Sequence, residues 1–236
     1  MKKLIIFTLL LAFLGCSSIL KAQSLAVFMG VKMGPSFANF EGKGVSNDLK
    51  QRIGFGFGLV SDFSIKKSND KDYSRWSLCP EINFIPGGAK GKSTLIDTTT
   101  NTTVESNDIT SKFNYLNIPV MIRFYHGILG KAKSGLFAEI GPYGSYLLSA
   151  KRVGTVTTNN KSTDIDEDVK ADFENTDYGI SFGGGVSIAS ILTVNYRYNW
   201  GMVNISKMVN ISKYKEDVTN RSWGIYFNLT LPIGGK

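Results

Sequence analysis

The sequence predicts an all-β fold, an antiparallel up-and-down β-barrel of eight strands. Apolar residues recur at every second position in eight segments, no segment follows a helical period, and long and short connections alternate between the segments. The composition suits a folded chain, because 42% of the 236 residues are hydrophobic and only 19% are charged. The expected strands are 25–34, 52–65, 75–85, 113–124, 135–148, 177–188, 192–202 and 222–231.

The first three strands carry bulky apolar residues on one face and small or polar residues on the other. In the second strand, Phe55 and Phe57 alternate with Gly54, Gly56 and Gly58. Glycine weakens a strand interior, so this stretch favours bulk on one face and open space for other side chains on the opposite face. The three apolar sets are Val27, Met29, Val31 and Met33; Ile53, Phe55, Phe57, Leu59, Phe63 and Ile65; and Trp76, Leu78, Ile82 and Phe84.

The other five strands follow the same rule, and their second face carries charges. Arg123 lies near the end of 113–124, Glu139 near the start of 135–148, and Arg197 within 192–202. The five apolar sets are Leu116, Ile118, Val120, Ile122 and Phe124; Leu136, Ala138, Ile140, Tyr146 and Leu148; Tyr178, Ile180, Phe182, Val186 and Ile188; Leu192, Val194, Tyr196, Tyr198, Trp200 and Met202; and Trp223, Ile225, Phe227, Leu229 and Leu231.

The connections indicate a transmembrane barrel of the outer-membrane type. Such barrels have short periplasmic turns and long extracellular loops, and an even number of strands places both termini in the periplasm. We expect the polar segments 86–112 and 149–176 to be mobile extracellular loops that bury nothing. The expected connections are 35–51, 66–74, 86–112, 125–134, 149–176, 189–191 and 203–221.

The apolar face is expected to meet lipid, with Phe55, Phe57, Ile118 and Phe227 as lipid contacts. A soluble, lipocalin-like barrel would invert the two faces. Charges at mid-strand positions of the non-aromatic face oppose that alternative, as do aromatic residues near strand ends, where the girdles of membrane barrels lie. The charges are Asp62, Glu81, Arg123, Glu139 and Arg197, and the aromatic residues are Trp76, Tyr146, Tyr178, Trp200 and Trp223.

Several of these strands resemble those of a known family. The stretch KFNYLNIPVMIRFY (112–125) is similar to the signature strand of the porin-family outer-membrane β-barrel proteins of Bacteroidetes, a group that includes PorT-like proteins. The stretches GLFAEIGPYGSYLLSAK, DYGISFGGGVSI and VFMGVKMGPSFANF resemble other strands of that family. The resemblance spans the mature chain and implies an outer-membrane barrel. One departure is the end LPIGGK, because barrels of this type usually end on an aromatic residue that assists assembly.

Residues 1–23 have the features of a signal peptide, which leaves 24–236 as the barrel domain. Cleavage after Ala22 or Gln23 is one reading, and lipid attachment at Cys16 is the other. The formal net charge of the whole chain is +8. Removing the leader takes away three lysines of 27 basic residues, so 24 basic against 19 acidic residues leave +5. This modest excess in an exported protein argues against a nucleic-acid partner.

The sequence predicts no enzyme, no cofactor and no metal site. The single histidine, His126, is expected in a solvated periplasmic turn, far from the outer rim where a barrel hydrolase would need it. With one histidine and one mature cysteine, Cys79, a zinc site of the usual ligands is not expected.

The charges of the inner face are expected to form a network in the lumen. The predicted turn between the fourth and fifth strands places Arg123 opposite residue 138 or 139, so we expect an ion pair between Arg123 and Glu139. Glu81 and Arg197 are available to extend it. In the alternative, water fills the lumen and these charges are merely solvated.

Two classes of function remain open. The first is a structural outer-membrane barrel with a largely filled lumen, or one with limited passage of small solutes. The second is an interaction barrel that binds a partner through its long outer loops or works in a secretion apparatus. The expected partners are outer-membrane lipid, the barrel-assembly machinery and an extracellular or secretion-system protein. A soluble ligand-binding barrel is a weaker third reading.

Overall fold

The structure is a computed structural model, and it describes residues 25–42, 45, 49–65, 74–97, 102–128, 134–158, 161–188, 191–207 and 217–233. The expected signal peptide at 1–23 lies outside these residues. The elements are β1 (Leu25–Glu41), β2 (Lys50–Ile65), β3 (Ser74–Asp97), β4 (Thr102–Gly127), β5 (Gly135–Thr158), β6 (Lys161–Asp168), the 3-10 turn η2 (Lys170–Asp172), β7 (Thr176–Ile188), β8 (Leu192–Gly201) and β9 (Thr219–Pro232).

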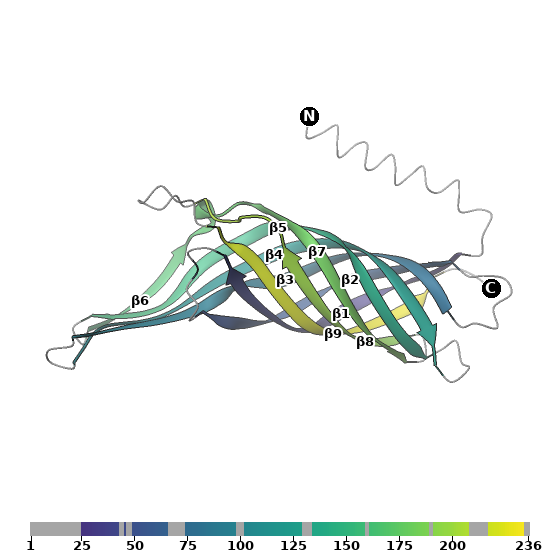
Figure 1. Cartoon of the computed structure of the whole chain (residues 1–236), viewed down its shortest axis with the longest axis horizontal. Coiled ribbons are helices and arrows are strands. Elements are labelled where there is room, and N and C mark those ends of the chain that lie inside the picture. The colour runs from purple at the N-terminus through teal and green to yellow at the C-terminus, as the bar shows by residue number, and fades with distance from the viewer. Residues whose placement is uncertain are drawn as a thin grey trace, which may run out of the picture.

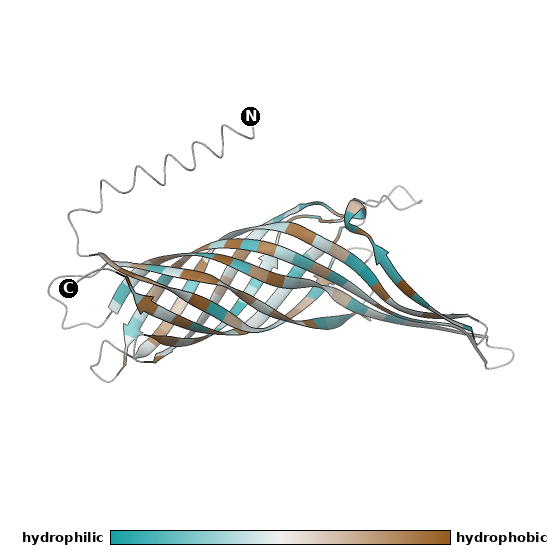
Figure 2. Cartoon of the chain, turned by 180° about the vertical axis from the view of Figure 1, so that it is seen from behind, coloured by the Kyte–Doolittle hydropathy of each residue, from teal (hydrophilic) through white to brown (hydrophobic). Residues whose placement is uncertain are grey.

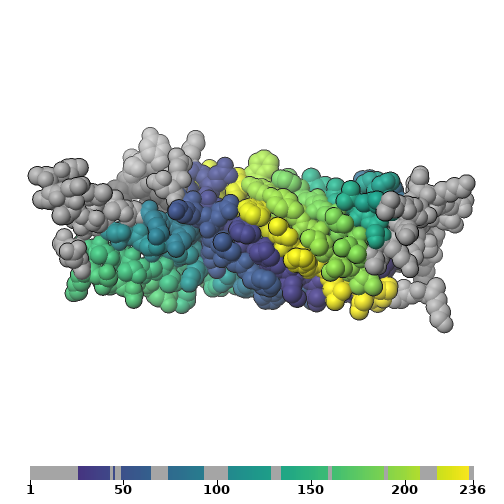
Figure 3. Space-filling view, turned by 90° about the horizontal axis from the view of Figure 1, so that it is seen from below, coloured from purple at the N-terminus to yellow at the C-terminus, as the bar shows by residue number. Residues whose placement is uncertain are grey.

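Eight of the strands form a closed antiparallel ring. Their order is β4-β3-β2-β1-β9-β8-β7-β5, and the pairing of β4 with β5 closes it. Each wall strand pairs with the wall strands before and after it in the chain, and β1 pairs with β9. β6 lies outside the ring and pairs with β5, so β7 also pairs with β5. Figure 3 shows β1, β9 and β8 side by side along one face of the cylinder. The predicted eight-stranded up-and-down barrel is therefore confirmed.

The two faces of the wall follow the sequence alternation. In β5, buried and exposed residues alternate from Gly135 to Leu148. The exposed residues include many large apolar side chains, and about half of the buried residues are polar or charged. Figure 2 shows the hydrophobic residues along the cylinder, while β6 is mainly hydrophilic. A soluble globule would bury the apolar face, so this inverted arrangement is that of a wall surrounded by lipid.

The glycines of β2 make room for bulky groups inside the barrel. A Cβ atom at Gly56 would lie 3.2 Å from the ring of Tyr226, and one at Gly54 would lie 2.4 Å from the ring of Pro86. Phe55 and Phe57 project outward on the other face. The alternation of phenylalanine and glycine therefore matches a wall with an open outer side and a crowded inner side.

The segments 86–112 and 149–176 were expected to be loops, but most of their described residues lie in strands. β3, β4 and β5 continue well beyond the barrel, and β6 adds a fourth strand to form a projecting sheet (Figure 1). Polar residues in these segments pair their backbone groups across strands, because hairpin partners already in register can simply extend. An irregularity between Asn114 and Tyr115 marks the place where the sheet leaves the cylinder, as bulges bend strands.

An apolar cluster covers the mouth of the barrel at the base of the projecting sheet. It consists of Phe113, Tyr115, Leu147, Ala150, Val169, Phe173, Ile205 and Val218. The rings of Phe113 and Phe173 meet edge to face, with centroids 4.5 Å apart. Val169 and Phe173 belong to the segment that was expected to bury nothing, so that expectation is wrong. We call this group the apolar cap.

Among the described residues, no helix is long and apolar enough to cross a membrane.

Candidate functional site

The candidate site is the lumen, where alternate residues of every wall strand point inward. Glu81, Arg123, Glu139 and Arg197 are all on this face and at most 8% exposed. They come from β3, β4, β5 and β8, which are neighbours or lie across the narrow interior from one another. In so small a barrel there is room only for side chains, so charges from different strands meet.

Arg197 of β8 reaches across the lumen and joins two carboxylates, which lie on β3 and β5 on either side of β4. Its Nη1 and Nη2 atoms donate to Oε2 and Oε1 of Glu81 at 2.5 and 2.9 Å. Its Nε atom donates to Oε1 of Glu139 at 3.0 Å, and Nη2 donates to the same oxygen. Because the guanidinium is a rigid planar fork, this geometry ties β8 to β3 across the barrel and to β5.

Lys32 and Arg123 complete the network at its two ends. The Lys32 ammonium donates to Oε2 of Glu81 at 2.8 Å and lies over the ring of Tyr226. Arg123 pairs in register with Glu139 and donates to it at 2.8 Å through Nη2, and its Nη1 atom reaches Oδ2 of Asp62 at 3.3 Å. The five side chains from Lys32 to Arg123 thus form one continuous chain of charge-assisted hydrogen bonds.

Neutral amides occupy the remaining acceptor positions of the two central carboxylates. Asn83 donates to Glu81 at 2.9 Å, and Asn195 donates to Glu139 at 3.1 Å. A buried ion pair offsets its desolvation only when such additional hydrogen bonds are present. We call the set Lys32, Glu81, Arg123, Glu139 and Arg197 the lumen network.

Sequence reasoning missed Lys32 as a member of the network, and it placed Asp62 on the inner face without its contact with Arg123. Both alternate with lipid-facing residues, Val31 and Met33 around Lys32 and Phe63 beside Asp62. A lysine between two lipid-facing residues has to point inward, so the period of two contains the signal. The partner of Lys32 depends on the stagger between β1 and β3, which the sequence alone does not give.

The expected lipid contacts lie on the outer face of the wall. Phe55, Phe57, Ile118 and Phe227 are 57, 54, 47 and 49% exposed. Aromatic residues also cluster on this face at both ends of the cylinder. Trp76 packs on Phe124 at one end, and Phe37 stacks on Trp223 at the other with ring centroids 4.0 Å apart.

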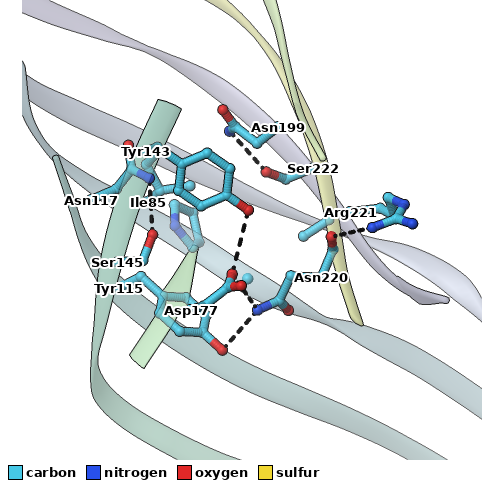
Figure 4. Close-up of a pocket in the computed structure, with 13 residues that line it drawn as sticks. Ile85, Tyr115, Asn117, Tyr143, Ser145, Asp177, Asn199, Asn220, Arg221 and Ser222 are labelled. Carbon is cyan, nitrogen blue, oxygen red and sulfur yellow. Dashed lines mark hydrogen bonds between the residues drawn. The ribbon is translucent and has the colours of Figure 1, made fainter. Parts of the chain in front are cut away.

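A second polar region lies between the lumen network and the apolar cap. Figure 4 shows Asp177 of β7 at its centre, with the Tyr143 hydroxyl and the Asn220 amide pointing at the carboxylate. Asn220 donates to Oδ2 of Asp177 at 3.0 Å and also to the hydroxyl of Tyr115. We call this region, lined also by Asn117, Ser145, Asn199 and Ser222, the outer chamber.

Within the described part of the chain, no three His, Cys, Asp or Glu side chains come together as a metal-binding group. His126 is exposed at the end of β4 and lies 2.8 Å from the hydroxyl of Ser74. Cys79 is a buried free thiol at 1% exposure.

The chain resembles several solved outer-membrane proteins at low identity. Ail, the attachment invasion locus protein of Yersinia pestis, is 12% identical, with 86% of this chain and 98% of Ail covered and a TM-score of 0.38. OprG from Pseudomonas aeruginosa is 11% identical over 91% of this chain and 98% of OprG, with a TM-score of 0.35. Neisserial surface protein A is 10% identical over 86% and 96%, also with a TM-score of 0.35.

A comparison with curated proteins gives no match. The family model for the outer membrane protein beta-barrel domain, by contrast, matches residues 21–207. That range includes every wall strand except β9. The chain therefore belongs to the outer membrane protein beta-barrel domain family, which implies a place in the outer membrane of a Gram-negative bacterium.

Proposed function

We propose that the protein is a closed, non-enzymatic outer-membrane barrel that anchors an interaction surface outside the cell. The barrel is the anchor, and the projecting sheet of β3 to β6 is the surface. The observation that carries this proposal is the lumen network, whose five side chains span the interior and are each at most 8% exposed.

The network supports a closed lumen because its buried side chains meet across the middle of the barrel. The guanidinium of Arg197 on β8 contacts carboxylates on β3 and β5, and the apolar cap lies nearer the sheet. Opening a path would separate buried charges from their partners, which costs about 3–5 kcal/mol for a broken buried pair. Limited passage of small solutes is therefore the less favoured function.

The shape of the molecule supports an external position for the projecting sheet. The sheet lies at one end, while β1 begins and β9 ends at the other end, where Phe28 pairs with Pro232 (Figure 1). Membrane barrels carry their long extensions outside the cell and their short turns in the periplasm. Both chain termini are then periplasmic, and insertion requires the barrel-assembly machinery.

The projecting sheet has the properties of a surface that binds protein. β6 pairs only with β5 along the described sheet, and its eight residues are almost all exposed. An exposed polar edge and two solvated faces favour contact with another polypeptide. A secretion-system protein, as the resemblance to PorT-like proteins of Bacteroidetes implies, is one candidate partner.

Conductance in planar lipid bilayers tests the closed lumen. The folded wild-type protein should insert without steady current steps. The double variant Glu81→Ala/Arg197→Ala, which removes the central bridge with no net change of charge, should conduct. Regular ohmic current steps from the wild-type protein, equal to those of the double variant, would show that the barrel is a pore and would contradict the closed lumen.

Thiol labelling of intact cells tests the orientation. A membrane-impermeant maleimide should label Asp164→Cys on β6 and leave His126→Cys at the opposite end unlabelled. Native Cys79 is buried and serves as an internal control for barrel integrity. Labelling of His126→Cys alone would mean that the barrel is inverted.

A further inference from the structure

The outer face of the wall carries a group of lysines where the barrel continues into the projecting sheet. Ala89 of β3 and Phe113 of β4 point inward, at 2% and 0% exposure. Because side chains alternate along a strand, their neighbours Lys90 and Lys112 point outward. Lys50 of β2 pairs in register with Lys90 and so shares its face. We call the outward lysines of β2, β3 and β4 the lysine patch, which consists of Lys50, Lys90, Lys92 and Lys112.

The lysine patch carries more positive charge than its surroundings balance. Within the described residues, Asp108 is the one carboxylate on the outer face of β2, β3 and β4, and it lies 3.5 Å from Lys90 and 2.8 Å from Lys92. Four lysines against one carboxylate leave a net charge of +3. The other acidic side chains on this face of the sheet lie on β6, with β5 between them and the patch, and they are Asp164, Asp166 and Asp168.

Two pairs of lysines face each other directly across neighbouring strands. Lys50 is the register partner of Lys90, and Lys112 is the register partner of Lys151 on β5. Like charges directly opposite each other destabilise a sheet, because their Cβ atoms are only about 4.5–5.5 Å apart. Lys151 reaches Asp166 at 3.2 Å. Lys50 and Lys112 have no ion-pair partner among the described residues, so an anion that contacts both members of a pair would relieve the repulsion.

The lysine patch begins where the apolar surface of the wall ends. On the same face, Phe84 of β3 stacks on Phe57, and Lys90 follows further along the strand. Leu116 of β4 pairs in register with Phe84, and Lys112 lies beyond it toward the sheet. At about 3.3 Å per residue, Lys112 is roughly 13 Å from Leu116 along a tilted strand. A lysine stem can cover apolar surface while its ammonium group stays in the polar layer, so the patch lies at the level of lipid headgroups.

We propose that the lysine patch binds the phosphate groups of a phosphorylated glycolipid in the outer leaflet of the outer membrane. Phosphate oxygens accept charge-assisted hydrogen bonds from ammonium groups, and clusters of lysines beside a membrane-spanning surface attract anionic lipid headgroups. The acyl chains of the same lipid lie along the apolar wall below the patch, which favours a lipid over a soluble anion. This inference rests on the proposed external position of the projecting sheet, because that position places the patch in the outer leaflet.

Native mass spectrometry of the detergent-solubilised protein tests the lysine patch. The protein is titrated with diphosphorylated lipid A and, separately, with the same lipid after dephosphorylation. The wild type should bind the phosphorylated lipid far more tightly than the dephosphorylated one. Each lysine near an anionic headgroup contributes about fivefold in affinity, so Lys90→Gln/Lys112→Gln should bind about 25-fold more weakly. Lys161→Gln/Lys207→Gln removes the same charge from exposed positions outside the patch and should bind as the wild type does.

Equal affinity of the wild type and Lys90→Gln/Lys112→Gln for the phosphorylated lipid overturns the proposal. Displacement of the lipid by inorganic phosphate at the same concentration also overturns it, since the ligand would then be a soluble anion.

The lipid-free protein gives a second measurement. Lys112→Gln should melt at or above the wild-type Tm, because its side chain no longer repels Lys151. A clearly lower Tm would show that the pair needs no anion and would count against the patch. Binding in detergent does not depend on orientation, so a failure here is distinct from a failure of the external position, which thiol labelling tests.

Discussion

β3, β4 and β5 run through the barrel and on into the projecting sheet, and their charged side chains have different surroundings in the two regions. In the barrel, Glu81, Arg123 and Glu139 are buried and hydrogen-bonded on several sides. On the projecting sheet, the same strands, together with β6, carry the exposed pairs Lys92–Asp108 and Lys151–Asp166, at 2.8 and 3.2 Å. The N–O distances of the buried and exposed ion pairs are similar, while their exposure to solvent differs. The comparison teaches that burial, and not distance, decides what an ion pair contributes.

The largest expected effect comes from removing the central cation of the lumen network. Arg197→Met leaves Glu81 and Glu139 buried with one cation fewer, which should cost about 3–5 kcal/mol of unfolding free energy. Lys151→Met on the projecting sheet is the matched control and should cost at most about 1 kcal/mol. Urea unfolding of detergent-folded protein measures both. Equal losses of unfolding free energy in the two variants would contradict the expected difference between buried and exposed ion pairs.

The second-largest effect on stability is expected from a charge placed on the lipid-facing side of the barrel. Phe57→Arg should cost about 2–4 kcal/mol, because Phe57 lies within the apolar belt and arginine is disfavoured near the bilayer midplane. Thr155→Arg on the projecting sheet meets water and should stay within about 0.5 kcal/mol of wild type. The two variants are compared by unfolding in lipid vesicles. A spin label at Phe57 that responds to water-borne quenchers instead of lipid-borne ones would contradict the assignment of faces.

A crowded inner face predicts a steric effect of intermediate size. Gly56→Val should cost about 1–3 kcal/mol, because a Cβ atom there already lies 3.2 Å from the Tyr226 ring that packs on Lys32. Gly144 faces outward and has no atom within 4 Å of its Cβ position. Gly144→Val should therefore fold as well as wild type. Comparable losses in both variants would show that strand bending, and not lumen crowding, requires these glycines.

The smallest expected effect concerns acid. The hydrogen bond from Lys92, aided by the charges of Lys90 and Lys92, lowers the pKa of Asp108 on the projecting sheet. A lowered pKa in the folded state means that the stabilisation exists at neutral pH and is lost as the pH falls through that pKa. Since Asp108 is exposed, Asp108→Asn should match wild type closely at pH 7 and coincide with it below the lowered pKa of Asp108 in urea titrations. A large difference at pH 7 would mean that the sheet depends on its charges.

The wall of the barrel could be predicted because residues that alternate with a period of two leave only two choices. Either the apolar face or the polar face of each strand points outward. The expected position of the connection between β4 and β5 also predicted Arg123 opposite residue 138 or 139, and the strands pair Arg123 with Glu139. The partner of Lys32 and the bridge from Arg197 to Glu81 depend on contacts across the lumen. Those contacts follow from the tilt and stagger of the closed ring, which no local pattern encodes.

The projecting sheet and the apolar cap could not be predicted for a different reason. Residues 86–112 and 149–176 are polar and carry no strong period, so composition favoured loops. Their strands exist because β3, β4 and β5 enter the segments already paired. Val169 and Phe173 are isolated apolar residues in polar sequence, and their burial depends on Ile205 and Val218 from a distant segment.

The central claim is that burial gives the luminal pairs their strength, and two double-mutant cycles test it most directly. One cycle combines Arg123→Met with Glu139→Gln, and the other combines Lys151→Met with Asp166→Asn, each measured by urea unfolding of detergent-folded protein. The account predicts a coupling energy of about 1–3 kcal/mol for the first pair and about 0–1 kcal/mol for the second. Coupling near zero in both cycles would show a solvated lumen and contradict the account.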